Sequence, residues 1–294
     1  MRILLDLLLG ACVVCAGWGI LGSARVVSQV RYQPTLRPSD FGLDPERIQL
    51  TTSDRVTIAG WLIPHPRPSG VLVLLHGYGA SKEDLLDLAR AFHEQGTFHL
   101  LLLDLRGHGD SGGSTITFGR REIEDLKAAL DYLASRPELA DLPVGCFGVS
   151  MGGAIAILAA AENSRIRAVA TDSAYADLAE TIARTQWLTY HMPRVPLGQM
   201  AIWGTEWRLG CSMGRLSPVS RVGRLSPRPV LIVHGSDDQG VPPSQARALF
   251  EAAGQPKELW VVEGAEHASS FYRQPEEYMR RMIRFFNEAF SRTP

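Results

Sequence analysis

The feature that most constrains this chain is a repeated alternation between short apolar runs and stretches with helical periodicity. Each run is short and lacks the polar-apolar alternation of a half-exposed strand, so it suits a strand buried on both faces. Such alternation implies right-handed crossovers and a mostly parallel sheet covered by helices on both sides. The sequence therefore predicts an α/β fold. The runs are residues 71–75, 98–103, 144–149, 168–171, 230–233 and 259–262.

Helical stretches lie between most of these runs. The first opens with Ser81 and has Asp84 three positions later, as at many helix starts, and an apolar stripe follows. Before the sheet begins, residues 47–52 and 56–63 are rich in β-branched side chains and predict an antiparallel hairpin. The predicted helices are 81–95, 120–135, 151–162, 244–253 and 275–290.

The rhythm breaks over residues 174–228, a long stretch that Pro and Gly interrupt and that is rich in aromatic residues. We interpret it as a helical cap or lid inserted into a single α/β domain spanning residues 47–294. Its aromatic side chains have two interpretations. They either form an apolar substrate pocket or pack the insertion onto the core.

Residues 3–23 form an apolar segment with one charge, Asp6. As a helix rising about 1.5 Å per residue, it has the length of a hydrocarbon core of about 30 Å. We therefore expect residues 1–24 to anchor the chain in a membrane and 25–46 to form a linker. A cleaved signal peptide is the alternative. More arginines follow the segment than precede it, which favours a cytoplasmic catalytic domain.

Composition excludes other classes of function. The formal net charge is −1 and no dense Lys/Arg run occurs, so nucleic acid is not an expected partner. The four cysteines have no metal-ligand spacing, and the only close pair, Cys12 and Cys15, lies in the apolar segment. We expect neither a metal nor an organic cofactor.

The pattern Gly-x-Ser-x-Gly, which surrounds many nucleophilic serines, occurs around Ser111 and around Ser150. In a chain with 28 glycines the string alone is weak evidence. The copy around Ser111 resembles the nucleophile signature of chymotrypsin-like proteases, but their all-β fold does not suit this alternating chain. The copy around Ser150 has a different setting.

Ser150 follows the strand 144–149 and opens the helix 151–162, which is the context of a nucleophile elbow. Side chains two positions to either side would collide in so sharp a turn, and Gly148 and Gly152 remove them. We therefore predict Ser150 as the nucleophile.

A nucleophilic serine needs a histidine as base and a carboxylate that orients the histidine. After an elbow of this kind, the chain order is serine, acid, histidine. Asp237 and Asp238 follow the run 230–233, and His267 follows 259–262. Both positions lie at carboxyl ends of predicted strands, where parallel sheets carry their sites.

Several other residues compete for these roles. Asp172 ends a predicted strand and is an alternative acid, although a structural role suits it better. His76, His108 and His234 also follow strands, and only their place in the chain order disfavours them as the base. We interpret these three as residues that order loops through hydrogen bonds.

Backbone N–H groups provide the expected oxyanion hole. The helix start at Met151 directs its N–H and the positive end of the helix dipole to the place where an oxyanion would form. The run 76–79, His-Gly-Tyr-Gly, follows the strand 71–75 and can supply a second donor, for which we favour the Tyr78 N–H.

Together these segments resemble the α/β-hydrolase family, particularly hydrolases grouped with serine aminopeptidases, acyl-lipid hydrolases and the prolyl-oligopeptidase catalytic domain. The resemblance implies an α/β-hydrolase fold. It also identifies the acid as Asp238, because in that family the acid is an Asp that is followed, after two intervening residues, by Val or Ile and then Pro. It also implies that the Ser111 loop is structural. The matching residues are 76–79, 104–113, 148–153, 235–242 and 264–267.

The predicted function is acyl transfer to water by a serine hydrolase. A carboxylesterase or acyl-lipid hydrolase acting on a small-molecule ester is our first expectation. A serine peptidase acting on short peptides is the alternative, and a non-catalytic binding protein of the same fold is a third. The lid carries no recognisable substrate signature.

Overall fold

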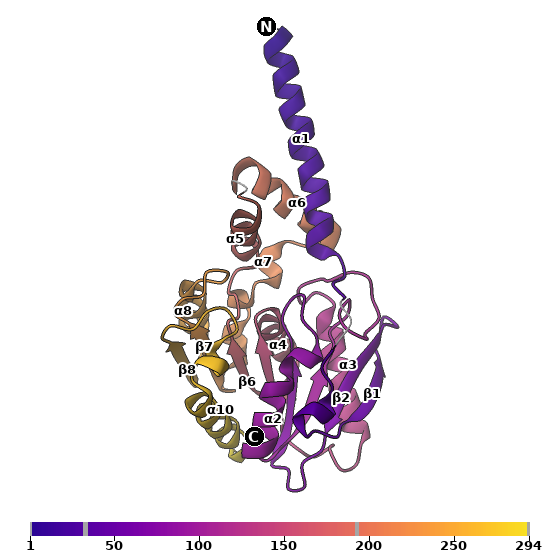
Figure 1. The fold of residues 1–294 in the computed structure, drawn as a ribbon, viewed down its shortest axis with the longest axis vertical. Coiled ribbons are helices and arrows are strands. Elements are labelled where there is room, and N and C mark those ends of the chain that lie inside the picture. The colour runs from indigo at the N-terminus through magenta and orange to yellow at the C-terminus, as the bar shows by residue number, and fades with distance from the viewer. Residues whose placement is uncertain (1, 32–34, 192–193, 293–294) are drawn as a thin grey trace.

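The computed structural model describes residues 2–31, 35–191 and 194–292. Strands and helices alternate through most of it (Figure 1). The strands are β1 (Glu46–Thr51), β2 (Thr57–Ile63), β3 (Gly70–Leu75), β4 (Phe98–Leu103), β5 (Val144–Val149), β6 (Ile166–Asp172), β7 (Val230–Gly235) and β8 (Lys257–Val262). The α-helices are α1 (Arg2–Val27), α2 (Leu86–Gln95), α3 (Glu122–Ser135), α4 (Met151–Glu162), α5 (Leu178–Tyr190), α6 (Gln199–Leu209), α7 (Met213–Leu216), α8 (Pro243–Ala252), α9 (Ser270–Arg273) and α10 (Pro275–Ser291).

The strands form one sheet of eight in the order β1-β2-β4-β3-β5-β6-β7-β8. The β1–β2 and β2–β4 pairs are antiparallel, and all other pairs are parallel. The predicted mostly parallel sheet and the antiparallel hairpin at its edge are therefore confirmed. Consequently β3 to β8 all end at one edge of the sheet, and the loops that follow them meet there.

Helices cover both faces of the sheet, which explains why the strands are apolar without alternation. Along β3, Val71 and Val73 contribute to the core layer that contains α3 and α4. The intervening Leu72 and Leu74 contribute to the other layer, which contains α2 and α10. Because neighbouring side chains of a strand point to opposite faces, burial on both sides requires a continuous apolar run.

The helix predicted from Ser81 begins differently. Residues Lys82–Leu85 form a 3-10 turn, and α2 starts at Leu86. Ser81 precedes this tighter turn and donates its backbone N–H to Asp84 Oδ2 at 2.8 Å, so the acidic residue three positions later contacts the start of the turn. The buried Lys82 ammonium lies 2.6 Å from Asp104 Oδ2, an ion pair that fixes the turn against the loop after β4.

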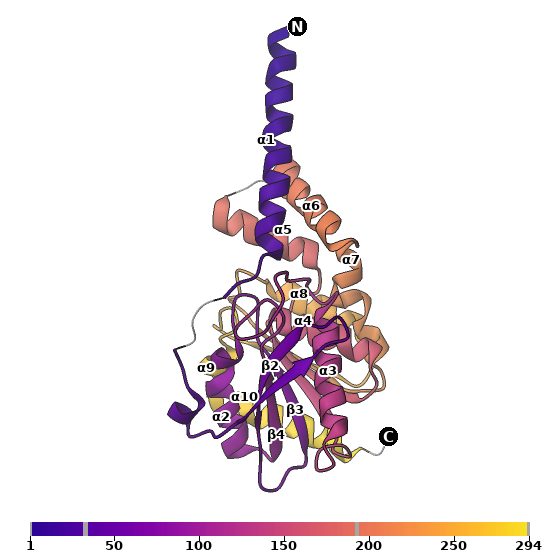
Figure 2. The ribbon, with the colours of Figure 1, turned by 90° about the vertical axis from the view of Figure 1, so that its right-hand side faces the viewer.

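Helix α1 leaves the body of the molecule, and only its C-terminal half lies beside α6 (Figures 1 and 2). A Cβ on Gly204 of α6 would lie 2.5 Å from the Gly19 carbonyl oxygen, so the two backbones are in close contact. The Arg208 guanidinium donates to Ser23 Oγ at 3.0 Å across the same contact.

The expected membrane anchor over residues 1–24 has no support from the structure. Within residues 2–31, 35–191 and 194–292, no helix combines the length and the apolar character required to cross a membrane. Helix α1 also extends past residue 24 to Val27, into the predicted linker 25–46. Residues 32–34 of that linker lie outside the described residues.

The insertion predicted over residues 174–228 contains α5, α6 and α7, followed by two short 3-10 turns, Pro218–Ser220 and Val222–Leu225. Residues 192–193 lie outside the described part. The helices α5 and α6 lie on the side of the sheet where β6 ends, next to α1 (Figure 2). Whether the insertion moves as a lid stays a prediction.

Candidate active site

Ser150 occupies a strained turn between β5 and α4. Its φ angle is +52°, a conformation that L-residues rarely adopt. The turn requires the flanking glycines: a Cβ on Gly148 would lie 2.3 Å from the Gly152 carbonyl carbon, and one on Gly152 would lie 2.4 Å from the Leu75 oxygen. The local sequence thus permits a turn that holds the serine hydroxyl clear of the sheet edge.

The structure brings Ser150, His267 and Asp238 together. His267 Nε2 lies 3.0 Å from Ser150 Oγ, and His267 Nδ1 lies 2.6 Å from Asp238 Oδ2. A carboxylate accepts the Nδ1 proton, which leaves the Nε2 lone pair facing the serine hydroxyl. The geometry therefore allows the serine proton to move to His267 during nucleophilic attack.

The Asp238 carboxylate is buried and positioned by its surroundings. Its Oδ1 accepts the Val241 N–H at 2.8 Å, and the buried His234 lies within 3.4 Å of Oδ2. The neighbouring Asp237 points elsewhere, because its Oδ1 accepts the Ser236 hydroxyl at 2.7 Å. Of the two adjacent acids, only Asp238 reaches His267.

Asp172 also lies close to the site without contacting His267 through its carboxylate. Its backbone oxygen accepts the Ser150 N–H at 2.8 Å, while its Oδ1 accepts the hydroxyls of Ser173 and Ser270. Complete burial raises the pKa of Asp172 to about 6. This arrangement fits a structural strand-end carboxylate.

Ser111 and His76 have structural partners. Ser111 is fully buried, donates to the Asp104 oxygen at 2.6 Å and accepts the Ala59 N–H at 2.8 Å. His76 Nε2 accepts the Leu105 N–H at 3.0 Å, and burial lowers the pKa of His76 to about 3, so the ring is neutral. These contacts tie the loops after β3 and β4 together.

The two predicted oxyanion donors lie beside Ser150. Met151 is the first residue of α4, and Tyr78 follows β3; both line a cavity that Ser150 also lines. Among the residues that the structure describes, neither backbone N–H donates to a protein acceptor. Both amides are therefore available to a ligand oxygen.

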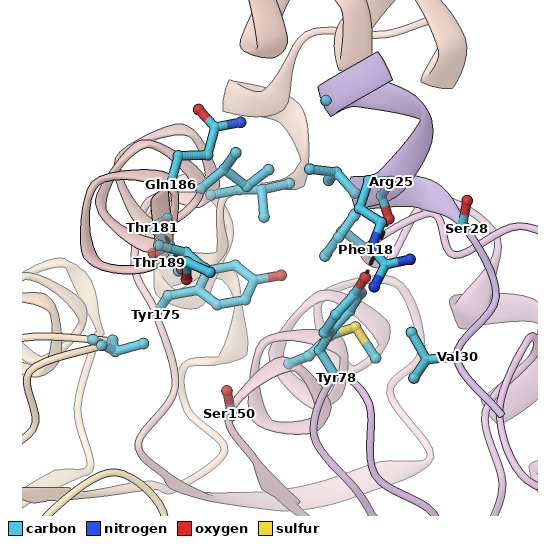
Figure 3. A pocket seen from close by; sticks show the side chains of 18 of the residues that line it. Arg25, Ser28, Val30, Tyr78, Phe118, Ser150, Tyr175, Thr181, Gln186 and Thr189 are labelled. Atoms are coloured by element: carbon cyan, nitrogen blue, oxygen red, sulfur yellow. Dashed lines mark hydrogen bonds between the residues drawn. The ribbon is translucent and has the colours of Figure 1, made fainter. Parts of the chain in front are cut away.

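The cavity has a volume of about 930 Å³, with Ser150 at its base (Figure 3). Helix α5 and Tyr175 form one side, and the C-terminal half of α1 forms the other. Trp18 of α1 meets Tyr190 of α5 edge-to-face at 5.9 Å, so the two walls touch. Apolar wall residues include Leu21, Val26, Phe118, Met151, Leu178, Ile182 and Val241.

A second, smaller cavity of about 320 Å³ reaches Ser150 from the other side. Tyr78, Ser150 and His267 line both cavities. The small cavity differs in character, because two acidic residues, Asp84 and Asp172, are among those that line it. The serine hydroxyl thus lies where a large chamber and a small one meet.

The sequence did not identify α1 or Tyr175 as parts of the site. Tyr175 lies three residues after the end of β6, so its position at the catalytic edge of the sheet was a usable signal. Helix α1 gave no such signal, because an apolar helix has the same pattern whether it packs on a lipid or on a protein.

The chain is also similar to known proteins. The profile of the family described as "Serine aminopeptidase, S33" matches residues 66–206. The chain is 29% identical over 226 residues to the protein YqkD of Bacillus subtilis (strain 168), covering 76% of this chain and 73% of that one. It is 28% identical to the polyketide transferase ATR5 of Stachybotrys chlorohalonatus, covering 82% of this chain and 98% of the relative.

Among solved structures, the Pyrococcus furiosus esterase Pf2001 superimposes with a TM-score of 0.75 at 25% identity, covering 90% of this chain and all of that one. Fold, elbow and relatives together define an α/β serine hydrolase. The predicted fold class is confirmed. In sequence and in fold the chain is similar to the α/β hydrolases.

Proposed function

We propose that this protein hydrolyses carboxylic esters, with Ser150 as nucleophile, His267 as base and Asp238 as the orienting acid. One observation supports this above all. The Ser150 hydroxyl contacts the His267–Asp238 pair and at the same time lies at the base of a large cavity with mainly apolar walls. A nucleophile placed against such a chamber suits an acyl group.

In the proposed reaction, Ser150 Oγ attacks the ester carbonyl while His267 Nε2 takes its proton. The N–H groups of Tyr78 and Met151 hold the developing oxyanion. His267 then returns the proton to the leaving alcohol, which gives an acyl-serine. Water activated by His267 attacks this ester, releases the carboxylic acid and restores the free hydroxyl of Ser150.

Peptide hydrolysis is the alternative, which the description of the matching family profile favours. An aminopeptidase must bind a positively charged α-amine, and a carboxylate in the pocket is the usual partner for such a charge. No Asp or Glu is among the described residues that line the large cavity, whereas Arg25 and Arg31 are. This charge distribution supports an ester, as does the resemblance to the Pf2001 esterase.

A fluorophosphonate probe tests the proposal, because it labels activated serines. We expect wild type and Ser111→Ala to be labelled and Ser150→Ala to remain unlabelled. Wild-type protein that has not met the probe should then hydrolyse a nitrophenyl ester faster than an aminoacyl nitroanilide. Absence of labelling in wild type would favour a non-catalytic binding protein, and a preference for the anilide would favour the peptidase.

A second proposal concerns location: residues 1–24 associate with a membrane. Trp187, Trp203 and Trp207, on the helices beside α1, are each more than half exposed, which supports it. Tryptophan is enriched at membrane–water interfaces. Carbonate extraction should leave the full chain in the membrane pellet and release a chain that begins after Ser23. Release of the full chain would contradict the proposal.

A further inference from the structure

Three buried polar atoms without partners gather around the large cavity. In the described part of the chain, six buried side-chain nitrogen or oxygen atoms have no hydrogen-bond partner. Three of the six belong to residues that line this cavity: Trp18 Nε1, Tyr175 Oη and Gln186 Oε1. Tyr175 is 3% exposed and Gln186 is 5% exposed, so bulk solvent does not compensate for the missing bonds.

Other polar groups on α5, the helix that carries Gln186, have hydrogen-bond partners. The Thr181 hydroxyl donates to the Asp177 oxygen at 2.8 Å, and the Thr185 hydroxyl donates to the Thr181 oxygen at 2.9 Å. A buried polar group without a partner destabilises the fold, and apolar residues of the same shape would avoid that cost. The unpaired groups at Tyr175 and Gln186 therefore indicate that something other than the protein bonds to them.

The close-up shows how these groups lie relative to the nucleophile. Tyr175 projects from its loop into the chamber above Ser150, with its hydroxyl directed into the open space between α5 and α1 (Figure 3). Gln186 lies farther from Ser150 on α5 (Figure 3). Tyr175 and Gln186 thus lie at different distances from the nucleophile, in a chamber whose other walls are mainly apolar.

The donor and acceptor set indicates the matching ligand group. An indole N–H only donates, an amide oxygen only accepts, and a phenol does both. An alcohol hydroxyl can accept from an indole or phenol donor such as Trp18 or Tyr175, and it can donate to an amide oxygen such as that of Gln186. A plain hydrocarbon chain would leave all three atoms unpaired, and an ammonium group would find no carboxylate among the described lining residues.

We propose that the large cavity selects esters whose acyl chain carries a hydroxyl group remote from the carbonyl, with Tyr175 and Gln186 as specificity-determining residues. The inference rests on the esterase function proposed above. It narrows the substrate class from acyl esters in general to hydroxyacyl esters.

The test uses the full-length protein and nitrophenyl esters of octanoic acid, either unsubstituted or with one hydroxyl at carbon 6, 7 or 8. We expect kcat/KM for at least one hydroxylated ester to exceed that for octanoate about tenfold or more, since a site built to bond a hydroxyl rejects the analogue that lacks it. Tyr175→Phe and Gln186→Met should each reduce this ratio several-fold. Thr185→Val is the matched control on the same wall, and should keep the ratio because its hydroxyl is already bonded within the helix.

Thermal unfolding tests whether the Tyr175 hydroxyl instead stabilises the fold. Removing a hydroxyl that has no protein partner should leave the thermal midpoint of Tyr175→Phe equal to or above that of wild type. A midpoint several degrees lower would mean that the hydroxyl bonds to the protein, and would overturn the proposal.

The remaining outcomes separate the two levels of inference. If Ser150 is labelled and octanoate is hydrolysed, yet no hydroxylated ester is preferred, the hydroxyl subsite is wrong and the esterase proposal stands. A preference for an ester of octanedioic acid, with a carboxylate at the chain end, would likewise overturn the hydroxyl subsite and indicate pairing with Arg25. If Ser150 is not labelled and no ester is hydrolysed, both proposals fail.

Discussion

At the scale of single residues, the two adjacent acids Asp237 and Asp238 have separate environments. Asp238 is buried and contacts His267, whereas the Asp237 carboxylate accepts the hydroxyl of its neighbour Ser236. The Asp237 backbone lies against the loop after β8, since its N–H donates to the Ala265 oxygen at 2.9 Å. Their distinct partners make them a matched pair for mutagenesis.

We expect Asp238→Asn to lower kcat on a nitrophenyl ester by roughly 10³- to 10⁴-fold, because an amide at this position favours the wrong histidine tautomer. Asp237→Asn should change kcat less than about threefold. Steady-state kinetics with both variants checks this. Comparable losses in the two variants would show that Asp238 has no special role.

Asp172 gives a prediction about pH. Burial raises its pKa from near 3.8 to about 6. Between these values the unfolded chain releases the proton while the folded protein retains it, so the free energy of unfolding falls as pH rises. Below pH 4 this loss of stability is absent, and above pH 6 it is constant at about 3 kcal/mol.

Asp172→Asn removes this titration. Relative to wild type, we expect the variant to gain roughly 3 kcal/mol in the free energy of unfolding between pH 4 and pH 7. Urea unfolding of both proteins at pH 4 and pH 7 measures how the stability difference between them changes with pH. A difference in hydrogen bonding that is the same at both pH values cancels in this comparison. A stability difference independent of pH would contradict the raised pKa.

At the scale of elements, the close contact between α1 and α6 depends on glycine. A Cβ on Gly204 would also lie 2.8 Å from Ser23 Oγ, so no side chain fits there without moving α1. Gly17 on α1 has no heavy atom within 4 Å of the corresponding position. Gly204 therefore lies at a helix–helix contact, and Gly17 does not.

We expect Gly204→Val to displace α1, because overpacking of this kind costs about 1–3 kcal/mol. Proteolysis after α1 should then be roughly tenfold faster or more, as the undocked population grows. Gly17→Ala should be cut at the wild-type rate. Equal rates for Gly204→Val and wild type would show that α1 docks without this contact.

The sequence predicted most elements because burial on both faces leaves a local pattern. Strands β4 and β5 and helix α4 have the predicted boundaries. Strand β6 is longer than expected, since pairing with β5 extends it to Ile166 although Arg167 interrupts the apolar run. The 3-10 turn at Lys82 was missed because its cause, the ion pair with Asp104, lies outside the local sequence.

The site was predictable to a similar extent. Ser150, Asp238 and His267 each follow a recognisable strand, and their chain order selected them from competing residues. The walls of the cavity were not predictable, because they depend on the packing of α1 against α5. These helices are far apart in the sequence, and no local pattern indicates that they meet. Tyr175 and Gln186 therefore emerged only from the structure.

At the scale of the whole molecule, the site combines both ends of the chain. The segment from Trp18 to Arg31 lines the same cavity as His267. After α1, the Ile116 N–H donates to the Val27 oxygen at 2.8 Å and the Val30 N–H donates to the Gly107 oxygen at 3.1 Å, which attaches the segment to the loop after β4. Helix α1 is thus a structural part of the hydrolase.

Deleting residues 2–22 should remove the part of the cavity wall that contains Trp18 and Leu21, and leave the attached segment that follows in place. We expect Ser150 to remain reactive towards fluorophosphonate, while kcat/KM for octanoate relative to acetate esters falls about tenfold, the loss of burial for roughly two methylene groups. A chain-length series on both proteins checks this. An unchanged chain-length profile would show that α1 does not contact the substrate.

The contact between Arg208 and Ser23 joins residues 185 positions apart. At a synthesis rate of about 5–20 residues per second, α6 follows the end of α1 from the ribosome by roughly 10–40 s. During that interval the face of α1 that later packs on α6 has no partner within the chain and is open to chaperones and targeting factors. The first segment of the chain to be made is therefore among the last to reach its place, and the substrate chamber is completed only after most of the sheet has been synthesised.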